Sequence, residues 1–187
     1  MQDLKEQFST YFDTGDDKLD SVISLFDKKH LNKGQVFIRQ GDICKDLAFV
    51  KQGIMRVSTV INGKEITQWI ATKGYYITDL AAFITGGRSR WTITALNNTT
   101  IYSISKSDYE QIGKIIPDWN IKEKQFITHC FTILENRVLQ FLSMTAEERY
   151  LHYFNNNKEL FNHIPQQYIA SMLGMTPETL SRIRKKS

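Results

Sequence analysis

The sequence predicts an α+β protein in which a β barrel, roll or sandwich is followed by one long helix and a C-terminal helix-turn-helix. Between about Lys33 and Ile104, short β-branched and aromatic runs alternate with turn residues. From Asp118 to about Ser143 neither Gly nor Pro interrupts the chain, and two short amphipathic segments flank Gly174 near the C-terminus. Strands followed by helices indicate the α+β class.

The N-terminal segment, Met1 to about Lys29, is predicted to be helical around a break at Gly15. Its apolar positions recur at helical spacing, and we expect these helices to pack on the sheet. The positions are Leu4, Phe8, Phe12, Leu19, Val22, Ile23 and Phe26.

Six later runs have the length and composition of strands, and Asn62-Gly63 between two of them is the strongest hairpin signal in the chain. Glycines and an Asn-Asn pair separate the others. The runs are Val36–Ile38, Leu47–Val50, Ile54–Ile61, Ile66–Ile70, Trp91–Leu96 and Thr99–Ile104.

A short helix is predicted after the last strand, because Ser107 and Glu110 have capping-box spacing, and Pro117 should end it. The long helix follows. Its apolar residues recur near the 3.5-residue spacing of a coiled coil, which favours a dimer interface, although a single buried helix in a monomer remains the alternative. The expected interface residues are Phe126, Cys130, Ile133, Arg137 and Phe141.

A second capping box, Thr145 with Glu148, predicts a helix from Ala146 to about Asn155, which the Asn155–Asn157 run should interrupt. The helix-turn-helix lies beyond it. Ala170 supplies the small residue where two steeply crossing helices touch, and Gly174 the positive φ of the turn.

Two apolar pairs, Ile169 with Leu173 and Leu180 with Ile183, place an apolar stripe on each of these two helices. Thr176 should cap the second helix, with Pro177 at its first position. A polar, basic face then points outward, as entry into a DNA major groove requires; ordinary helix packing is the alternative. The expected DNA-binding residues are Thr176, Glu178, Thr179, Ser181, Arg182, Lys185 and Lys186.

Composition indicates a two-part, cytoplasmic protein. The 187 residues are 41% hydrophobic, yet no apolar run approaches the roughly 18–20 residues of a membrane span, and the polar N-terminus is no signal peptide. The separated Cys44 and Cys130 predict reduced thiols rather than a disulfide or metal site. The net charge of +4 is concentrated in residues 161–187, which hold four basic residues and one acidic residue.

The order of these parts resembles the catabolite activator and fumarate–nitrate regulator (Crp/Fnr) superfamily of bacterial transcription factors, over essentially the whole chain. The resemblance is most specific at Ala146–Tyr150 and Tyr168–Arg184, which are similar to short Bacteroidetes-type members. It implies a cyclic-nucleotide-binding-like β-roll, with a jelly-roll double-stranded β-helix, over 1–116. A dimerisation helix over 117–143 and a winged-helix-like DNA-binding domain over 144–187 would follow.

The resemblance also implies partners and reading residues. A homodimer would bind an inverted repeat in double-stranded DNA and act with RNA polymerase, without a membrane. Family members read bases with a Glu and an Arg four positions later, here Glu178 and Arg182, which suit cytosine N4 and guanine O6/N7. The usual Arg before that Glu is Pro177, so a different operator sequence is expected.

The effector segment implied by the resemblance is altered. Where cyclic-nucleotide-binding members carry Gly-Glu and then Arg-Ser-Ala, this chain has Thr78-Asp79 and Arg88-Ser89-Arg90-Trp91. Cyclic AMP is therefore not the expected ligand. The residues Thr78, Asp79, Arg88, Ser89 and Arg90 are candidates to hold a cyclic nucleotide or another small anion, and solvated turn charges with no ligand are the alternative.

Two other function classes are alternatives for this sequence. A ligand-binding interaction module would use the helix-turn-helix only for packing, without sequence-specific DNA affinity. A cupin-type enzyme needs clustered metal ligands on strands, whereas none of the four histidines falls in a predicted strand. Nucleophile elbows and phosphate-cradling loops are also unmatched, so neither a catalytic nor a metal site is expected. The histidines are His30, His129, His152 and His163.

Overall fold

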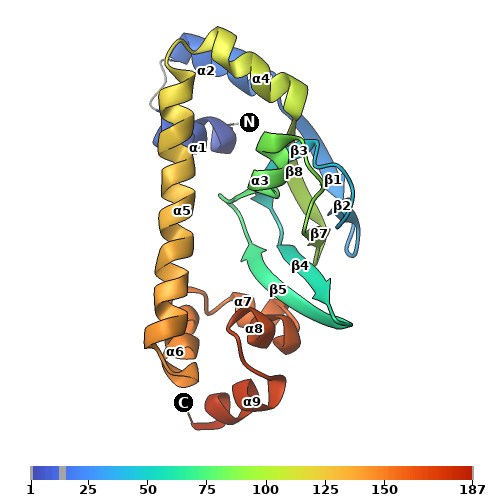
Figure 1. Ribbon diagram of the computed structural model, residues 1–187, viewed down its shortest axis with the longest axis vertical. Coiled ribbons are helices and arrows are strands. Elements are labelled where there is room, and N and C mark those ends of the chain that lie inside the picture. The colour runs from blue at the N-terminus through green and yellow to red at the C-terminus, as the bar shows by residue number, and fades with distance from the viewer. Residues whose placement is uncertain (1, 13–15, 187) are drawn as a thin grey trace.

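A β-roll lies at one end of the molecule, a group of short helices lies at the other, and one long helix runs between them (Figure 1). The computed structural model describes residues 2–12 and 16–186. The expected break at Gly15 lies outside these residues. The α+β class and the order of roll, long helix and C-terminal helices are confirmed.

The roll consists of two four-stranded antiparallel sheets, with strand orders β1-β8-β3-β6 and β2-β7-β4-β5. Alternate residues of both sheets face a shared core. The strands are β1 (Asp27–Leu31), β2 (Val36–Ile38), β3 (Asp46–Gln52), β4 (Met55–Ile61), β5 (Lys64–Ala71), β6 (Tyr76–Ile77), β7 (Thr92–Ala95) and β8 (Thr99–Ser105).

All six predicted strands are present, and the hairpin between β4 and β5 turns at Asn62 and Gly63, whose φ angles of 52° and 75° are those of a type I′ turn. The predicted N-terminal helical segment extended too far toward the C-terminus. The last helix before the roll, α2, ends at Ile23, and Lys29 lies in strand β1. This edge strand is polar and mostly exposed, so its sequence lacks the apolar alternation of a strand.

One histidine therefore lies in a strand, contrary to expectation. His30 is in β1, where its Nδ1 lies 3.1 Å from the hydroxyl of Thr100. The correction does not create a metal site, since the described residues contain no group of three or more His, Cys, Asp or Glu side chains that could hold an ion.

Helices cover one end and one side of the roll and continue into the C-terminal end of the molecule (Figure 1). In the part of the chain that the structure describes, no helix has the length and apolarity needed to cross a membrane. The helices are α1 (Gln2–Phe12), α2 (Asp16–Ile23), α3 (Leu80–Thr85), α4 (Lys106–Ile115), α5 (Trp119–Ser143), α6 (Ala146–Asn156), α7 (Leu160–His163), α8 (Gln166–Met172) and α9 (Pro177–Lys186).

Local capping sets the helix boundaries. The Thr145 capping box is present in full, with both Thr145 and Glu148 bonded to each other's backbone N–H. The predicted cap at Ser107 was wrong, because Ser105, two residues earlier, accepts from the Asp108 N–H. Strand β8 leads directly into α4 there, so the last strand residue serves as the cap. Pro117 separates α4 from α5 as expected.

A second apolar core joins the roll to the C-terminal helices. Ile54 and Ile70 of the roll region are buried against Phe161, Ile164 and Ile169, which belong to the α7–α8 region. Strand β5 is the outer strand of its sheet, and α8 lies along its free edge. A buried strand edge must find hydrogen-bond partners, and this one finds them outside the sheet.

Those partners come from two helices. The Thr67 N–H of β5 donates to the Ser171 hydroxyl of α8 at 2.9 Å. The neighbouring Gln68 carbonyl accepts from the Arg137 guanidinium of α5, which also donates to the Met172 carbonyl at 2.6 Å. One arginine therefore connects the long helix, the roll and the first helix of the helix-turn-helix.

The turn between α8 and α9 is built around Gly174, with φ +67°. A Cβ placed on this glycine would lie 2.6 Å from Cε1 of Phe141 on α5. The position therefore needs glycine for two reasons, the left-handed backbone and the close approach of an aromatic ring.

We expect Gly174→Ala to destabilise the protein more than Gly86→Ala. Gly86 has a similar φ of +72° but open space around its Cβ position, so its replacement should cost only the left-handed strain of about 1 kcal/mol. At Gly174 the overlap with Phe141 should add about 1–3 kcal/mol. Urea unfolding of both variants measures the difference, and Phe141→Leu should recover part of it. Equal losses in the two variants would contradict the packing argument.

Candidate functional site

The two helices of the helix-turn-helix are held together by a small apolar core. Leu180 is fully buried and Ile183 is 8% exposed, and both belong to the cluster that contains Ile169 and Ala170 of α8. Burial of this stripe fixes the rotation of α9 about its axis, so the opposite face is directed outward.

The start of α9 is capped as the sequence predicts. The hydroxyl of Thr176 accepts from the Thr179 N–H at 3.2 Å, and Pro177 is the first helical residue. The cap satisfies one N–H of the first turn, and the proline N1 position has no N–H to lose.

The outward face of α9 is polar and basic. Glu178, Arg182, Lys185 and Lys186 are exposed, whereas Thr179 and Ser181 are half-buried between this face and the core. The Arg182 guanidinium donates to the Thr179 hydroxyl at 3.3 Å. Within residues 2–12 and 16–186, Glu178 and Arg182 form no ion pair with each other, which leaves both able to contact a ligand.

The charge of Glu178 is stabilised locally. The pKa of this carboxyl is lowered, chiefly by a hydrogen bond to its own backbone N–H and then by the Thr176 hydroxyl, with a smaller contribution from Arg182. The N-terminal face of α9 therefore offers an anionic acceptor beside a guanidinium donor at neutral pH.

The stripe of α5 on which the sequence placed a dimer interface faces the chain's own domains. Phe126 is 6% exposed and lies against Tyr11 and Phe12 of α1. Cys130 packs on the same core, and Arg137 holds the strand edge described above. These three residues therefore have partners within the chain, because apolar side chains that bind the roll repeat at the same spacing as a coiled-coil seam.

The neighbouring stripe of α5 is apolar and exposed instead. Its members are 44–81% exposed and recur at intervals of three and four residues, which places them on one face of the helix. They are Phe131, Leu134, Val138 and Leu142.

The proposed effector residues lie close together, but their polar groups have partners within the chain. Asp79, 1% exposed, caps α3 through the Ala82 N–H and accepts from the Arg90 N–H at 2.8 Å. The Arg90 guanidinium reaches the same carboxylate at 3.4 Å. The aspartate thus has a structural role that fixes the turn after α3.

The other three candidates are also engaged. Thr78 donates to the Asp46 carbonyl, Arg88 to the Gly41 carbonyl at 2.8 Å and Ser89 to the Trp91 carbonyl at 2.8 Å. Neither the cavity beside α5 nor the one between β4–β5 and α7–α8 is lined by any of the five candidates.

Sequence reasoning missed the contact between the roll and the helix-turn-helix. Arg56 of β4 is 5% exposed, and its guanidinium lies 3.6 Å from the centre of the Tyr168 ring on α8. It also donates to the Thr67 hydroxyl at 2.8 Å and pairs with Glu65. An arginine inside the apolar run Met55–Val57 was the available signal, since a buried charge needs partners.

Comparison with known proteins agrees with this architecture. Residues 28–114 match the cyclic nucleotide-binding domain family. No curated protein sequence matches the chain. Many solved structures are similar to it, among them three that match over most of both chains.

The catabolite activator protein of Thermus thermophilus is 20% identical, covering 92% of this chain and 83% of that one, with a TM-score of 0.58. FixK2 of Bradyrhizobium japonicum is 17% identical, with coverages of 86% and 83% and a TM-score of 0.71. The c-di-GMP responsive global regulator CLP of Xanthomonas campestris is 15% identical, with coverages of 92% and 91% and a TM-score of 0.71. At these identities the similarity shows the fold.

The capping geometry of α9 predicts the titration of Glu178. Its side-chain pKa should lie below the ordinary value of 4.5, because hydrogen bonds stabilise the carboxylate. Thr176→Ala should raise the pKa back toward that value by removing the hydroxyl. Carbon-13 NMR of the Glu178 carboxyl over an acid titration measures both. A wild-type pKa at or above 4.5 would overturn the cap geometry described for α9.

Proposed function

We propose that this protein is a homodimeric DNA-binding regulator of transcription. The proposal starts from the match of residues 28–114 to the cyclic nucleotide-binding domain family and from a fold that is similar to the Crp/Fnr regulators. The protein reads an inverted repeat with α9 and acts on transcription through RNA polymerase. Its action is binding rather than catalysis.

The observation that carries the proposal is the outward face of α9. A short, capped helix presents Glu178 and Arg182 four residues apart, with Lys185 and Lys186 following at its end. A guanidinium fork suits guanine O6 and N7, a carboxylate suits cytosine N4, and lysines neutralise phosphates. Thr176, Thr179 and Ser181 supply hydroxyls to the same surface. The chemistry is that of a major-groove reader.

Dimerisation places two such helices on one DNA site. The exposed stripe Phe131–Leu142 on α5 would pack against the same stripe of a second copy, as in a short coiled coil. Two recognition helices about 34–36 Å apart then meet successive turns of the same groove. The stripe supports dimerisation because four large apolar side chains on one helix face are otherwise left in water.

The effector proposed for the roll is a ligand other than cyclic AMP. Asp79 and Arg90 are paired with each other, and a ligand at this segment has to replace those bonds. The favoured effector at this segment is a small anion held by Arg88 or Arg90. The second candidate function, an interaction module without DNA reading, is favoured only by the extensive docking of α8 on the roll.

Substitutions on α9 should separate base reading from phosphate binding. On the best fragment selected from genomic DNA, Arg182→Ala should lose about 1–3 kcal/mol of discrimination at one base pair in each half-site. Lys185→Ala should weaken all fragments alike and reduce the slope of log K against log salt by about one unit per subunit. Fluorescence anisotropy over a salt series measures both effects. Weak binding that is indifferent to sequence and to both substitutions would favour the interaction module.

Charge on the exposed stripe of α5 should separate the subunits. Val138→Glu should give a monomer in sedimentation equilibrium, because a carboxylate cannot be desolvated at an apolar seam without a partner. Val60→Glu is the matched control, since Val60 is 55% exposed against 57% for Val138 but lies on β4. A dimer that survives Val138→Glu would place the interface elsewhere.

A further inference from the structure

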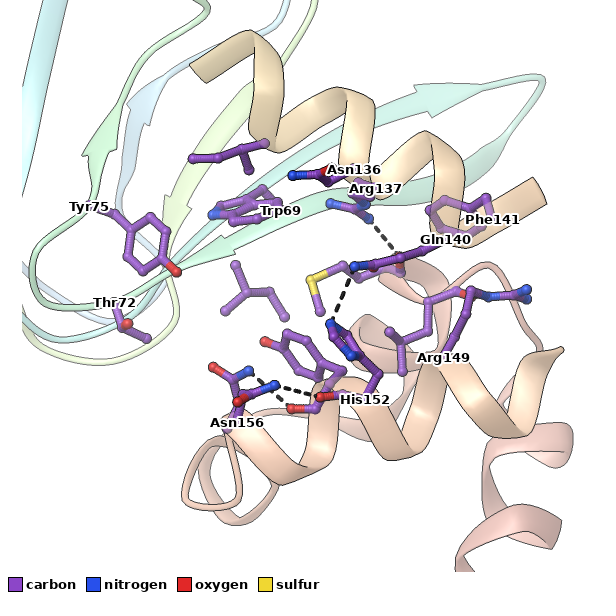
Figure 2. A pocket seen from close by; sticks show the side chains of 16 residues that line it. Trp69, Thr72, Tyr75, Asn136, Arg137, Gln140, Phe141, Arg149, His152 and Asn156 are labelled. Carbon is purple, nitrogen blue, oxygen red and sulfur yellow. Dashed lines mark hydrogen bonds between the residues drawn. The ribbon is translucent and has the colours of Figure 1, made fainter. Parts of the chain in front are cut away.

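A cavity of about 270 Å³ lies where the roll, the long helix and the C-terminal helices meet. Figure 2 shows Trp69 and Tyr75 on the sheet side, Arg137 and Gln140 reaching from α5, and His152 rising from α6. Met172 and Leu173, at the end of α8, complete its wall. The cavity is separate from Thr78–Arg90, the segment discussed above as an effector site.

The charged residues that line this cavity are all basic. Its lining contains Arg137 and Arg149 but no Asp or Glu, and within the part of the chain described by the structure neither arginine forms an ion pair. Arg149 directs its guanidinium away from Trp69, toward Phe141 and the Leu173 and Met144 carbonyls. Arg137 is therefore the cationic group beside the cavity.

The charge of Arg137 is only partly compensated. Two of the five N–H groups of a guanidinium are used for the Gln68 and Met172 carbonyls, and the rings of Trp69 and Phe141 lie 5.2 and 5.6 Å away. Burial lowers the pKa of this guanidinium. An anion in the cavity would give the charge the partner that the chain does not provide.

The remaining walls suit a flat ring with polar edges. The ring centres of Trp69 and Tyr75 lie 5.9 Å apart, with 59° between the ring planes. Tyr153 of α6 lines the same cavity, and burial is the chief cause that raises the pKa of its hydroxyl to about 12. Asn136, Gln140 and His152 add donors and acceptors on two sides. Aromatic and aliphatic walls with a few polar groups are typical of a small-molecule site.

We propose that this cavity binds a small aromatic anion, with one carboxylate or phosphate held by Arg137 and a planar ring between Trp69 and Tyr153. The acidic group accepts from the guanidinium. The ring edge is held by the Asn136 amide and the Gln140 amide oxygen, since the Gln140 amide nitrogen lies 3.2 Å from His152 Nε2. Aromatic carboxylates and nucleoside monophosphates share this chemistry.

Calorimetry on the full-length protein tests the site with indole-3-carboxylate, adenosine 5′-monophosphate and inorganic phosphate as probes. At least one ring-bearing probe should bind with a Kd below about 1 mM, and phosphate alone more weakly. Which of the two ring-bearing probes binds more tightly distinguishes a carboxylate from a nucleotide ligand. If neither ring-bearing probe binds with a Kd below about 1 mM, the proposal is overturned.

Two isoleucine substitutions locate the binding. Ile133 lines the cavity and is 37% exposed, so Ile133→Phe should fill the space and weaken binding at least about tenfold. Ile84, 39% exposed on α3, lines neither cavity, and Ile84→Phe should leave binding unchanged. Binding that survives Ile133→Phe but is lost with Arg90→Ala would assign the ligand to the roll and overturn the proposal.

Coupling to DNA rests on the proposed function. Because the cavity touches β5, α5, α6 and the end of α8, a ligand that fits only one arrangement of these parts shifts the population of that arrangement. DNA affinity should then change on adding the probe to wild type but not to Ile133→Phe. If the protein binds no DNA sequence specifically, the proposed function fails. Calorimetry still decides whether the cavity binds a small aromatic anion.

Discussion

The free edge of strand β5 sets the position of the two C-terminal helices α8 and α9 on the roll. Its Thr67 N–H and Gln68 carbonyl are turned away from the sheet, and a buried backbone group without a partner costs more than a hydrogen bond returns. Ser171 supplies one partner and Arg137 the other. Because Arg137 also holds the last carbonyl of α8, covering the strand edge orients the helix-turn-helix on the roll.

The local features of the fold could be predicted from short-range patterns. Turn residues marked the hairpin at Asn62-Gly63, and the Thr145 box and the Thr176–Pro177 start gave the boundaries of α6 and α9. Each depends on a few neighbouring residues. The missed strand β1 shows the limit, since an exposed edge strand is specified by its partner β8 rather than by its own alternation.

Features that depend on contacts between distant segments could not be predicted in this way. The sequence placed Phe126, Cys130 and Arg137 at an interface, and helical spacing alone does not tell an intrachain face from an interchain one. The sequence also places Leu134 and Val138 on a neighbouring stripe, but only the fold shows that this stripe is the exposed one. The cavity at Arg137 likewise forms where β5 meets α5, α6 and the end of α8, which lie far from β5 in the sequence.

Arg137 holds the helix-turn-helix against the roll by donating to carbonyls of both. Hydrogen exchange of the Thr67 amide tests it most directly, because that amide donates across the junction. In Arg137→Lys, which cannot donate to both carbonyls in the same geometry, Thr67 should exchange about 10- to 100-fold faster, with the β7 amides unchanged. If the Thr67 amide exchanges at the same rate in Arg137→Lys as in wild type, Arg137 does not hold the helix-turn-helix against the roll.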